Sequence, residues 1–309
     1  MSTSFVNSRL MKNTIEPFIG NSSFSDEVRD LISTLSKNKA SLLLVGERGS
    51  GKRFIARHIH FAQTKNFGCF VEMNCRTLSK EQMYFSFETV KDILRFNQQV
   101  TFFVAQIDCL SLELQKELLT LVNGTKGIED RFRIVSSTEK SLEENVASGT
   151  FLKELYYKLN AVVLNILPLR QRTDDILPLA EFYLSQFSKR SGIKFSSFSS
   201  EAKDLLKESF FTGNIDELVN CIQRAFIVGN PPEVSAMDLG LSNNKQIEKE
   251  MALQTFEDKS LKAAIDRFKK EYITRVLEEN GWNQTRTAKI LGIQRTYVIR
   301  LINELNIRK

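Results

Sequence analysis

Few residues in this sequence are suited to covalent cross-links or to metal binding. The four cysteines lie far apart without a CxxC pair, and the only histidines are His58 and His60. Such spacing predicts reduced, mostly buried thiols and argues against both a disulfide framework and a zinc site. We therefore assign no metal-binding residues and interpret the two histidines as structural. The cysteines are Cys69, Cys75, Cys109 and Cys221.

Long apolar runs are missing as well. No stretch approaches the roughly 18 apolar residues that indicate a transmembrane helix, and the N-terminus lacks the pattern of a signal peptide. These absences predict a cytoplasmic protein that does not contact a membrane. At 309 residues, of which 42% are hydrophobic and 26% charged, the chain is long enough for two or three domains with sizeable cores.

The positive charge is concentrated near the C-terminus. Between Lys259 and Lys309 the chain has 12 Lys and Arg against 5 Asp and Glu, a net charge of +7, whereas the remainder has 31 against 32, a net charge of −1. A basic module behind a near-neutral body indicates a nucleic-acid partner for that module.

The first half of the chain alternates between apolar segments and amphipathic ones. Five apolar segments have the length and composition of buried strands, and helical patterns lie between them. This alternation predicts a parallel α/β sheet covered by helices on both faces. After Asp174 the pattern is helical only, up to a break at Pro231 and Pro232. The predicted strands are residues 40–45, 69–75, 100–108, 131–138 and 161–169.

A phosphate-binding loop follows the first of these strands. The stretch GERGSGKR fits the pattern G-x-x-x-x-G-K and lies between a strand and a helix, as this motif requires. Its backbone N–H groups and the helix N-terminus behind them would hold phosphates. The motif normally ends in a Ser or Thr hydroxyl that reaches Mg²⁺, so the arginine found there leaves a metal site in doubt. The nucleotide-binding candidates are Gly46, Glu47, Arg48, Gly49, Ser50, Gly51, Lys52 and Arg53.

A helix-turn-helix is predicted within the basic C-terminal segment. Asn283 can cap a helix that ends at Leu291, Gly292 supplies the turn, and a second helix follows. We expect Ile290, Leu291, Ile293, Val298, Ile302 and Leu305 to form its apolar face. The start of the second helix would then enter the major groove of double-stranded DNA. The DNA-binding candidates are Asn283, Thr285, Arg286, Gln294, Arg295, Thr296, Tyr297 and Arg300.

Several blocks together resemble the AAA+ activators that remodel the sigma-54 form of RNA polymerase. They occur in that family's order and cover nearly the whole chain: FIGNS (18–22), LLLVGERGSGK (42–52), ARHIH (56–60), MNC (73–75), FLKELYYKLN (151–160), LPLRQRTDDI (167–176) and GNIDEL (213–218). The resemblance implies a AAA+ nucleotide-binding subdomain at 1–172, a small all-α lid at 173–241, a linker at 242–257 and a Fis-type helix-turn-helix domain at 258–309. We expect a layout like that of family members without a receiver domain.

The resemblance also implies functional residues that this chain replaces. The family has Asp-Glu where Ala105 and Gln106 stand, and those acids help to place Mg²⁺ and to polarise the attacking water. Glu139 replaces a sensor asparagine, and Asp216 replaces a lid arginine. The two arginines that act on a neighbour's γ-phosphate correspond to Leu152 and Lys158. We therefore assign no catalytic residue.

Two further differences concern partners. The family's GAFTGA loop, which contacts the polymerase, has no counterpart between Cys75 and Thr101. Leu301 stands where a lysine is usual in the DNA-binding helix. A preceding helix, with Leu261, Ile265, Phe268, Tyr272 and Val276 at helical spacing, resembles the family's dimerisation helix and implies a homodimer on a two-fold symmetric DNA site. A higher AAA+ oligomer and a contact with RNA polymerase stay open.

The sequence thus favours a DNA-binding transcription regulator with a degenerate AAA+ body, which could bind ATP or ADP without hydrolysing it. One alternative is an active, ATP-hydrolysing sigma-54 activator, which phosphate release and open-complex formation would reveal. Another is an inactive subunit that damps the ring of a related activator, which co-purification and a failure to bind DNA alone would favour.

Overall fold

The computed structural model describes residues 15–64, 68–125, 127–128, 130–241, 269–270, 273–274, 276–277, 280–291 and 295–304. The chain divides into two compact units, residues 1–244 and 245–309. None of the helices within these described ranges has the length and apolar character needed to cross a lipid bilayer.

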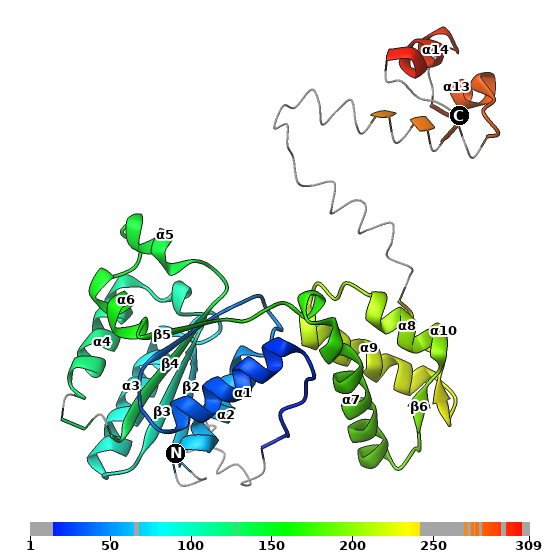
Figure 1. Cartoon of the computed structure of the whole chain (residues 1–309). Coiled ribbons are helices and arrows are strands. Elements are labelled where there is room, and N and C mark those ends of the chain that lie inside the picture. Colours follow the sequence, from blue (N-terminus) through cyan, green and yellow to red (C-terminus); the bar gives the residue numbers. More distant parts are fainter. Residues whose placement is uncertain are drawn as a thin grey trace. The chain divides into compact units, whose positions relative to one another are not determined.

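A five-stranded parallel sheet lies at the centre of the first unit (Figure 1). All five predicted strands are confirmed, and their order in the sheet is β2-β3-β4-β1-β5. Strands β3 and β4 are buried along almost their whole length, as expected of a parallel sheet covered on both faces. The strands are β1 (Leu42–Val45), β2 (Cys69–Asn74), β3 (Val100–Ala105), β4 (Phe132–Thr138) and β5 (Val162–Asn165).

The third strand ends earlier than predicted. Gln106 has φ 58°, in the left-handed region, and Ile107–Cys109 form a 3-10 turn. The prediction that the strand continues to residue 108 is therefore wrong, because apolar periodicity does not reveal a left-handed residue. The turn leaves Ala105 and Gln106 at the carboxyl edge of the sheet, where the loops after parallel strands meet.

Alternate residues of the sheet pack into two separate apolar clusters. Phe102 belongs to the cluster shared with α3, α4 and α6, whereas Phe103 belongs to the cluster shared with α1 and α2. The period of two along each strand thus places one helix group on each face. The helices around the sheet are α1 (Ser23–Ser36), α2 (Lys52–Thr64), α3 (Lys80–Arg95), α4 (Leu112–Asn123), α5 (Leu142–Ala147) and α6 (Lys153–Leu159).

A lid of helices follows the sheet, with a cluster of buried residues of its own. It also contains a short parallel ladder between β6 (Ser197–Phe198) and β7 (Glu233–Val234), which the helical pattern did not predict. The lid helices are α7 (Ile176–Ser191), α8 (Ser200–Glu208), α9 (Asn214–Val228) and α10 (Ala236–Leu239).

One buried carboxylate ties the start of the described chain to the lid. Asp175, which is fully buried, accepts hydrogen bonds from the backbone N–H groups of Asn21 and Ser22 at 2.7 and 2.8 Å and from the hydroxyls of Ser22 and Ser25 at 2.9 and 2.8 Å. The guanidinium of Arg172 lies 3.9 Å away. This set of donors compensates the cost of burying a charge.

The second unit holds helices α13 (Gln284–Leu291) and α14 (Arg295–Glu304). Its described core consists of Ile273, Leu277 and Leu301, against which Trp282, Leu291 and Ile302 pack. The two predicted helices are confirmed, whereas the predicted turn at Gly292 lies outside the described residues.

Replacing Asp175 by alanine is expected to lower the free energy of unfolding by about 3 kcal/mol, because four donors lose their acceptor in a buried site. Thermal or urea unfolding measures this change. The neighbouring Asp174 is exposed, so Asp174→Ala should change stability by less than about 0.5 kcal/mol. Equal effects of the two substitutions would contradict the assigned role of Asp175.

Candidate nucleotide and DNA sites

The loop between β1 and α2 has the geometry of a phosphate cradle. Gly49 and Gly51 have φ +73° and +99°, values that favour glycine, and a Cβ on Gly49 would lie 2.2 Å from the carbonyl oxygen of Gly213. Lys52 begins α2. The loop therefore presents backbone N–H groups next to a helix N-terminus, an arrangement that binds anions.

Lys52 points back onto this loop. Its Nζ donates hydrogen bonds to the carbonyl oxygens of Gly46 and Glu47 at 2.6 and 2.7 Å. Burial lowers the pKa of Lys52, while the carboxylates of Glu139, Asp108 and Asp216 act in the opposite direction.

Ser50 is another buried group of the loop. Its hydroxyl has no hydrogen-bond partner among the described residues, although the side chain is 1% exposed. A buried hydroxyl without a partner costs free energy, so a phosphate oxygen bound in the loop would supply a missing interaction.

Asn214 joins the phosphate loop to the lid. This fully buried residue has φ 57°, and its Nδ2 donates to the Arg48 carbonyl at 2.9 Å and to the Glu47 carboxylate at 3.1 Å. Its Oδ1 accepts from the N–H of Leu169 at 2.8 Å, and the N–H of Ile215 donates to the Gly49 carbonyl at 3.0 Å. One side chain thus holds the loop, the chain that leads into the lid and the start of α9 together.

Two arginines of the segment before α7 also contact the loop. Arg170 forms a two-pronged ion pair with the Glu47 carboxylate, and Arg172 donates to the Ser50 carbonyl at 2.7 Å. The sequence interpretation assigned no role to Arg170, Arg172 or Asn214. All three lie in blocks that carried the family resemblance, which was the available signal.

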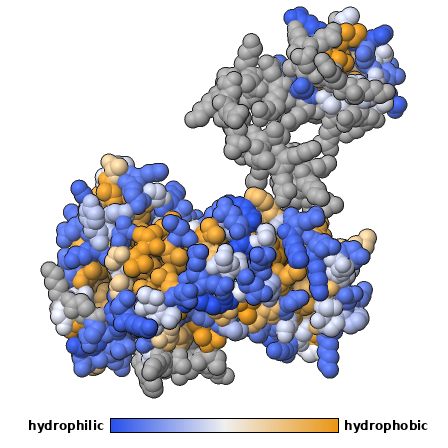
Figure 2. Space-filling model, viewed as in Figure 1, coloured by the Kyte–Doolittle hydropathy of each residue, from blue (hydrophilic) through white to orange (hydrophobic). Residues whose placement is uncertain are grey.

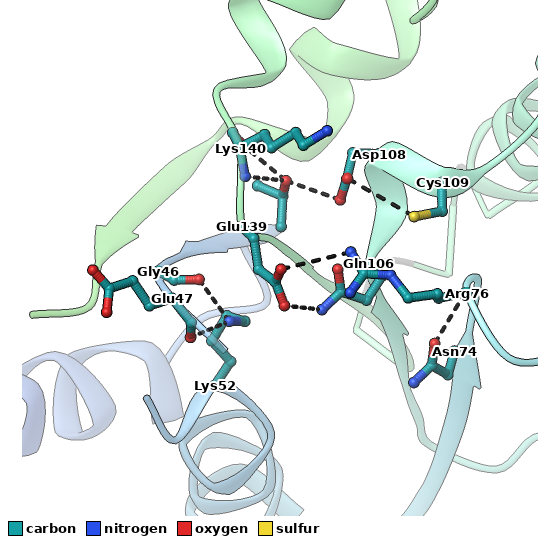
Figure 3. Close-up of polar contacts among 11 residues, drawn as sticks. Gly46, Glu47, Lys52, Asn74, Arg76, Gln106, Asp108, Cys109, Glu139 and Lys140 are labelled. Atoms are coloured by element: carbon teal, nitrogen blue, oxygen red, sulfur yellow. Dashed lines mark hydrogen bonds and ion pairs between the residues drawn. The ribbon is translucent and has the colours of Figure 1, made fainter. Parts of the chain in front are cut away.

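The position that corresponds to the missing acid pair is occupied by an amide bound to a carboxylate (Figure 3). Nε2 of Gln106 donates to Oε1 of Glu139 at 2.7 Å, and the guanidinium of Arg76 lies 3.6 Å from Oε2 of Glu139. Ala105 contributes only a methyl group. Two of the replaced positions, 106 and 139, are therefore partners in one hydrogen bond between the ends of β3 and β4.

Asp108 faces the same region through Thr138. The Thr138 hydroxyl donates to the Asp108 carboxylate at 3.0 Å, and the Thr138 carbonyl accepts from the N–H of Gly46, the first loop residue, at 3.2 Å. Figure 3 shows Asp108, Gln106, Glu139 and Lys52 at the ends of neighbouring elements. Thr138 thus connects Asp108 to Gly46 through two hydrogen bonds.

The other predicted site residues occupy varied places. Arg53 pairs with Glu72 of β2 at 2.7 Å, Arg48 is exposed on the loop, and Lys158 is exposed on α6. Leu152 packs partly buried against the sheet cluster. Asp216 is exposed beside the loop, since a Cβ on Gly49 would lie 3.3 Å from the Asp216 Cβ.

In the second unit, Asn283 has the predicted capping role. Its Oδ1 accepts from the N–H groups of Thr285 and Arg286, both at 3.2 Å. This side chain is therefore used by the helix end. Most of the remaining DNA-binding candidates are exposed, namely Thr285, Arg286, Arg295, Thr296, Tyr297 and Arg300, while Gln294 lies outside the described residues.

Two expectations for this unit change. Ile290 is 56% exposed, so its assignment to the buried apolar face is wrong; it lies on the outer side of α13. Leu301, at the position where a lysine is usual, is 7% exposed and packs in the core. Ile293, Leu305 and the predicted dimerisation residues Leu261, Ile265, Phe268 and Tyr272 lie outside the described residues, whereas Val276 is buried.

Comparison with known protein families matches three consecutive segments. Residues 19–169 match the Sigma-54 interaction domain, residues 170–255 the AAA+ ATPase lid domain, and residues 264–300 the Fis family of bacterial regulatory proteins. The fold and these modules define a AAA+ ATPase-type body with a helical lid and a Fis-type helix-turn-helix in one chain.

Curated relatives agree with this class. SfnR of Pseudomonas putida, a sigma54-dependent transcriptional activator, is 32% identical over 85% of this chain and 81% of its own length. The response regulator PilR of Pseudomonas aeruginosa is 29% identical over 86% of this chain, which spans 64% of PilR. The crystal structure of NtrX from Brucella abortus in complex with ADP superposes with a TM-score of 0.64, at 26% identity, over 94% of this chain and 69% of NtrX. The chain belongs to the family of sigma-54-dependent transcriptional regulators.

Replacing Asn214 by alanine is expected to lower the free energy of unfolding by about 2–4 kcal/mol, since buried partners in the loop and before the lid lose their hydrogen bonds. Chemical unfolding measures it. Asn97 is a matched control, because it is exposed, also has a left-handed φ of 65°, and makes no side-chain hydrogen bond with any residue that the structure describes. Asn97→Ala should cost only the roughly 1 kcal/mol of an alanine at positive φ. A similar decrease in the free energy of unfolding in both variants would contradict the role of Asn214 in joining the loop to the lid.

Proposed function

We propose that this chain is a sequence-specific DNA-binding transcription regulator whose AAA+ body binds ATP or ADP through residues 46–52 without hydrolysing it. On this proposal the body acts as a structural or sensory module and does not remodel sigma-54 polymerase. The family fold is that of a AAA+ ATPase, so the proposal depends on how this chain departs from the family at its reaction centre.

The observation that carries the proposal is the hydrogen-bonded pair of Gln106 and Glu139. Phosphoryl transfer needs groups that place the metal and orient water at the γ-phosphate. Gln106 has no charge, and its donor is engaged by Glu139. The Glu139 carboxylate is in turn held by Gln106 and Arg76, and Ala105 offers no ligand.

Other departures support the same proposal. The connection between β2 and β3 consists of α3 and two short loops, with α3 started by a capping box of Ser79 and Gln82. This short connection supports the proposal that the chain lacks the family's polymerase-contacting loop. The planar guanidinium of an arginine finger has no equivalent in Leu152 or Lys158, and such fingers contribute roughly 10³ to 10⁵ in rate.

Nucleotide binding is supported by the loop itself and by relatives. The glycine geometry, Lys52 and the unpartnered Ser50 hydroxyl fit a phosphate, and NtrX structures were determined with ADP and with ATP. The loop lacks the hydroxyl that usually binds Mg²⁺, because position 53 is an arginine, which pairs with Glu72. We propose Gly46–Arg53 as the nucleotide site, with no dedicated Mg²⁺ ligand.

We propose that double-stranded DNA binds at the start of α14, where Arg295, Thr296 and Tyr297 are exposed. A two-fold symmetric site would follow from a homodimer through the C-terminal module.

A higher oligomer of the AAA+ body is also proposed. Tyr157 of α6 and Val163 of β5 are 65% and 44% exposed, and Figure 2 shows apolar areas on the visible face of the body.

Steady-state phosphate release should not exceed that of Lys52→Ala at saturating ATP and Mg²⁺. The reason is that neither the metal nor the water is held for attack. The same preparations should fail to form open complexes with sigma-54 polymerase. Release that is well above the Lys52→Ala background, together with open complexes, would establish the active-activator alternative instead.

Arg295→Ala should weaken binding to the preferred DNA sequence by about 1–3 kcal/mol and should blunt discrimination between sequences, because it removes a groove contact. Selection from a random duplex library, followed by binding titrations at two salt concentrations, measures both effects. Lys289→Ala is the control: it removes one exposed positive charge of α13 and should weaken all sequences alike. An unchanged sequence preference in Arg295→Ala would refute the groove assignment.

A further inference from the structure

Three carboxylates lie near the phosphate loop, and the charges of all three act on Lys52. Asp108 is connected to the first loop residue through Thr138. Glu139 follows Thr138 directly in the chain and lies at the end of β4 (Figure 3). On the lid side, Asp216 stands beside Gly49.

The cations near the loop are placed differently. Lys52 is bound to loop carbonyls, Arg76 is ion-paired with Glu139, and the exposed Arg48 belongs to the loop itself. Arg53 and Arg170 are paired with Glu72 and Glu47. Of these cations, Lys52 and Arg48 belong to the loop, where inner phosphates bind, and Arg53 and Arg170 are paired with acids outside the terminal-phosphate side. Arg76 compensates Glu139 only in part, because the two groups are 3.6 Å apart and both side chains are partly exposed.

A triphosphate places its last phosphoryl group beyond the loop, at the carboxyl ends of the central strands, where metal ions usually neutralise it. Here Glu139 and Asp108 lie at that edge, and Asp216 of the lid lies beside Gly49 of the loop. A like charge within several ångströms of a bound phosphate repels it by an amount that corresponds to a roughly tenfold change in affinity. A diphosphate ends before it meets these acids.

We propose that this site selects nucleoside diphosphates over triphosphates, and that Glu139 is the main residue that excludes the terminal phosphate. The inference deepens the nucleotide binding proposed above and rests on it. The AAA+ body would then either sense the concentration of the nucleoside diphosphate or keep the diphosphate permanently bound.

Calorimetric titration of the full chain with ADP and with ATP tests this, in EDTA and in millimolar Mg²⁺. ADP should bind roughly tenfold or more tightly than ATP in both conditions. Glu139→Gln keeps a hydrogen-bonding group opposite Gln106 while it removes the charge. It should raise ATP affinity roughly tenfold and leave ADP within about threefold. Asp216→Asn provides a second, exposed variant with the same direction of change.

The control Glu201→Gln removes an exposed carboxylate of α8 and should leave the ratio of the two affinities unchanged. Equal ADP and ATP affinities in the unmodified chain, a preference for ATP in Mg²⁺, or a Glu139→Gln variant that strengthens both nucleotides equally would overturn the selectivity. If neither nucleotide binds more tightly than to Lys52→Ala, nucleotide binding itself fails, which is a distinct result.

Discussion

The buried side chain of Asn214 links the phosphate loop to both the sheet and the lid. Its hydrogen bonds reach Glu47, Arg48 and Leu169, and the next residue binds Gly49. The loop glycines tolerate positive φ without strain but have no side chains to fix the loop in place, so hydrogen bonds from outside the loop support it. The lid provides that support, so the loop geometry and the packing of the lid depend on each other.

This joint supports the phosphate loop, whereas the proposed loss of hydrolysis concerns a different place, the edge of the sheet. The loop keeps its glycines and its lysine, and Arg170 and Arg172 keep their contacts with it. At the edge of the sheet, by contrast, the family's acid and amide positions carry an amide and an acid, Gln106 and Glu139, which bind each other. Binding and turnover depend on different groups, so the proposal of nucleotide binding without hydrolysis requires a change only in the groups at the edge of the sheet.

The local pattern was sufficient to predict the five strands, the helix-turn-helix and the Asn283 cap, since each depends on spacing within about ten residues. Contacts between distant residues could not be predicted in this way. Asn214 and Glu47 are 167 positions apart, and Asp175 and Ser22 are 153 apart. The left-handed backbone of Gln106 could not be predicted, because the hydrophobic pattern carries no information on backbone handedness. The exposure of Ile290 could not be predicted either, because the pattern does not show which apolar side chains the small C-terminal core can cover.

The most direct test is a single-turnover experiment with the chain in excess over γ-labelled ATP, at concentrations above its measured dissociation constant for ATP and with Mg²⁺ present. Excess protein removes any dependence on product release, so only the chemical step is observed. The account predicts that the label stays in ATP to the same extent as with Lys52→Ala. Conversion to labelled phosphate by the unmodified chain, but not by Lys52→Ala, would contradict it.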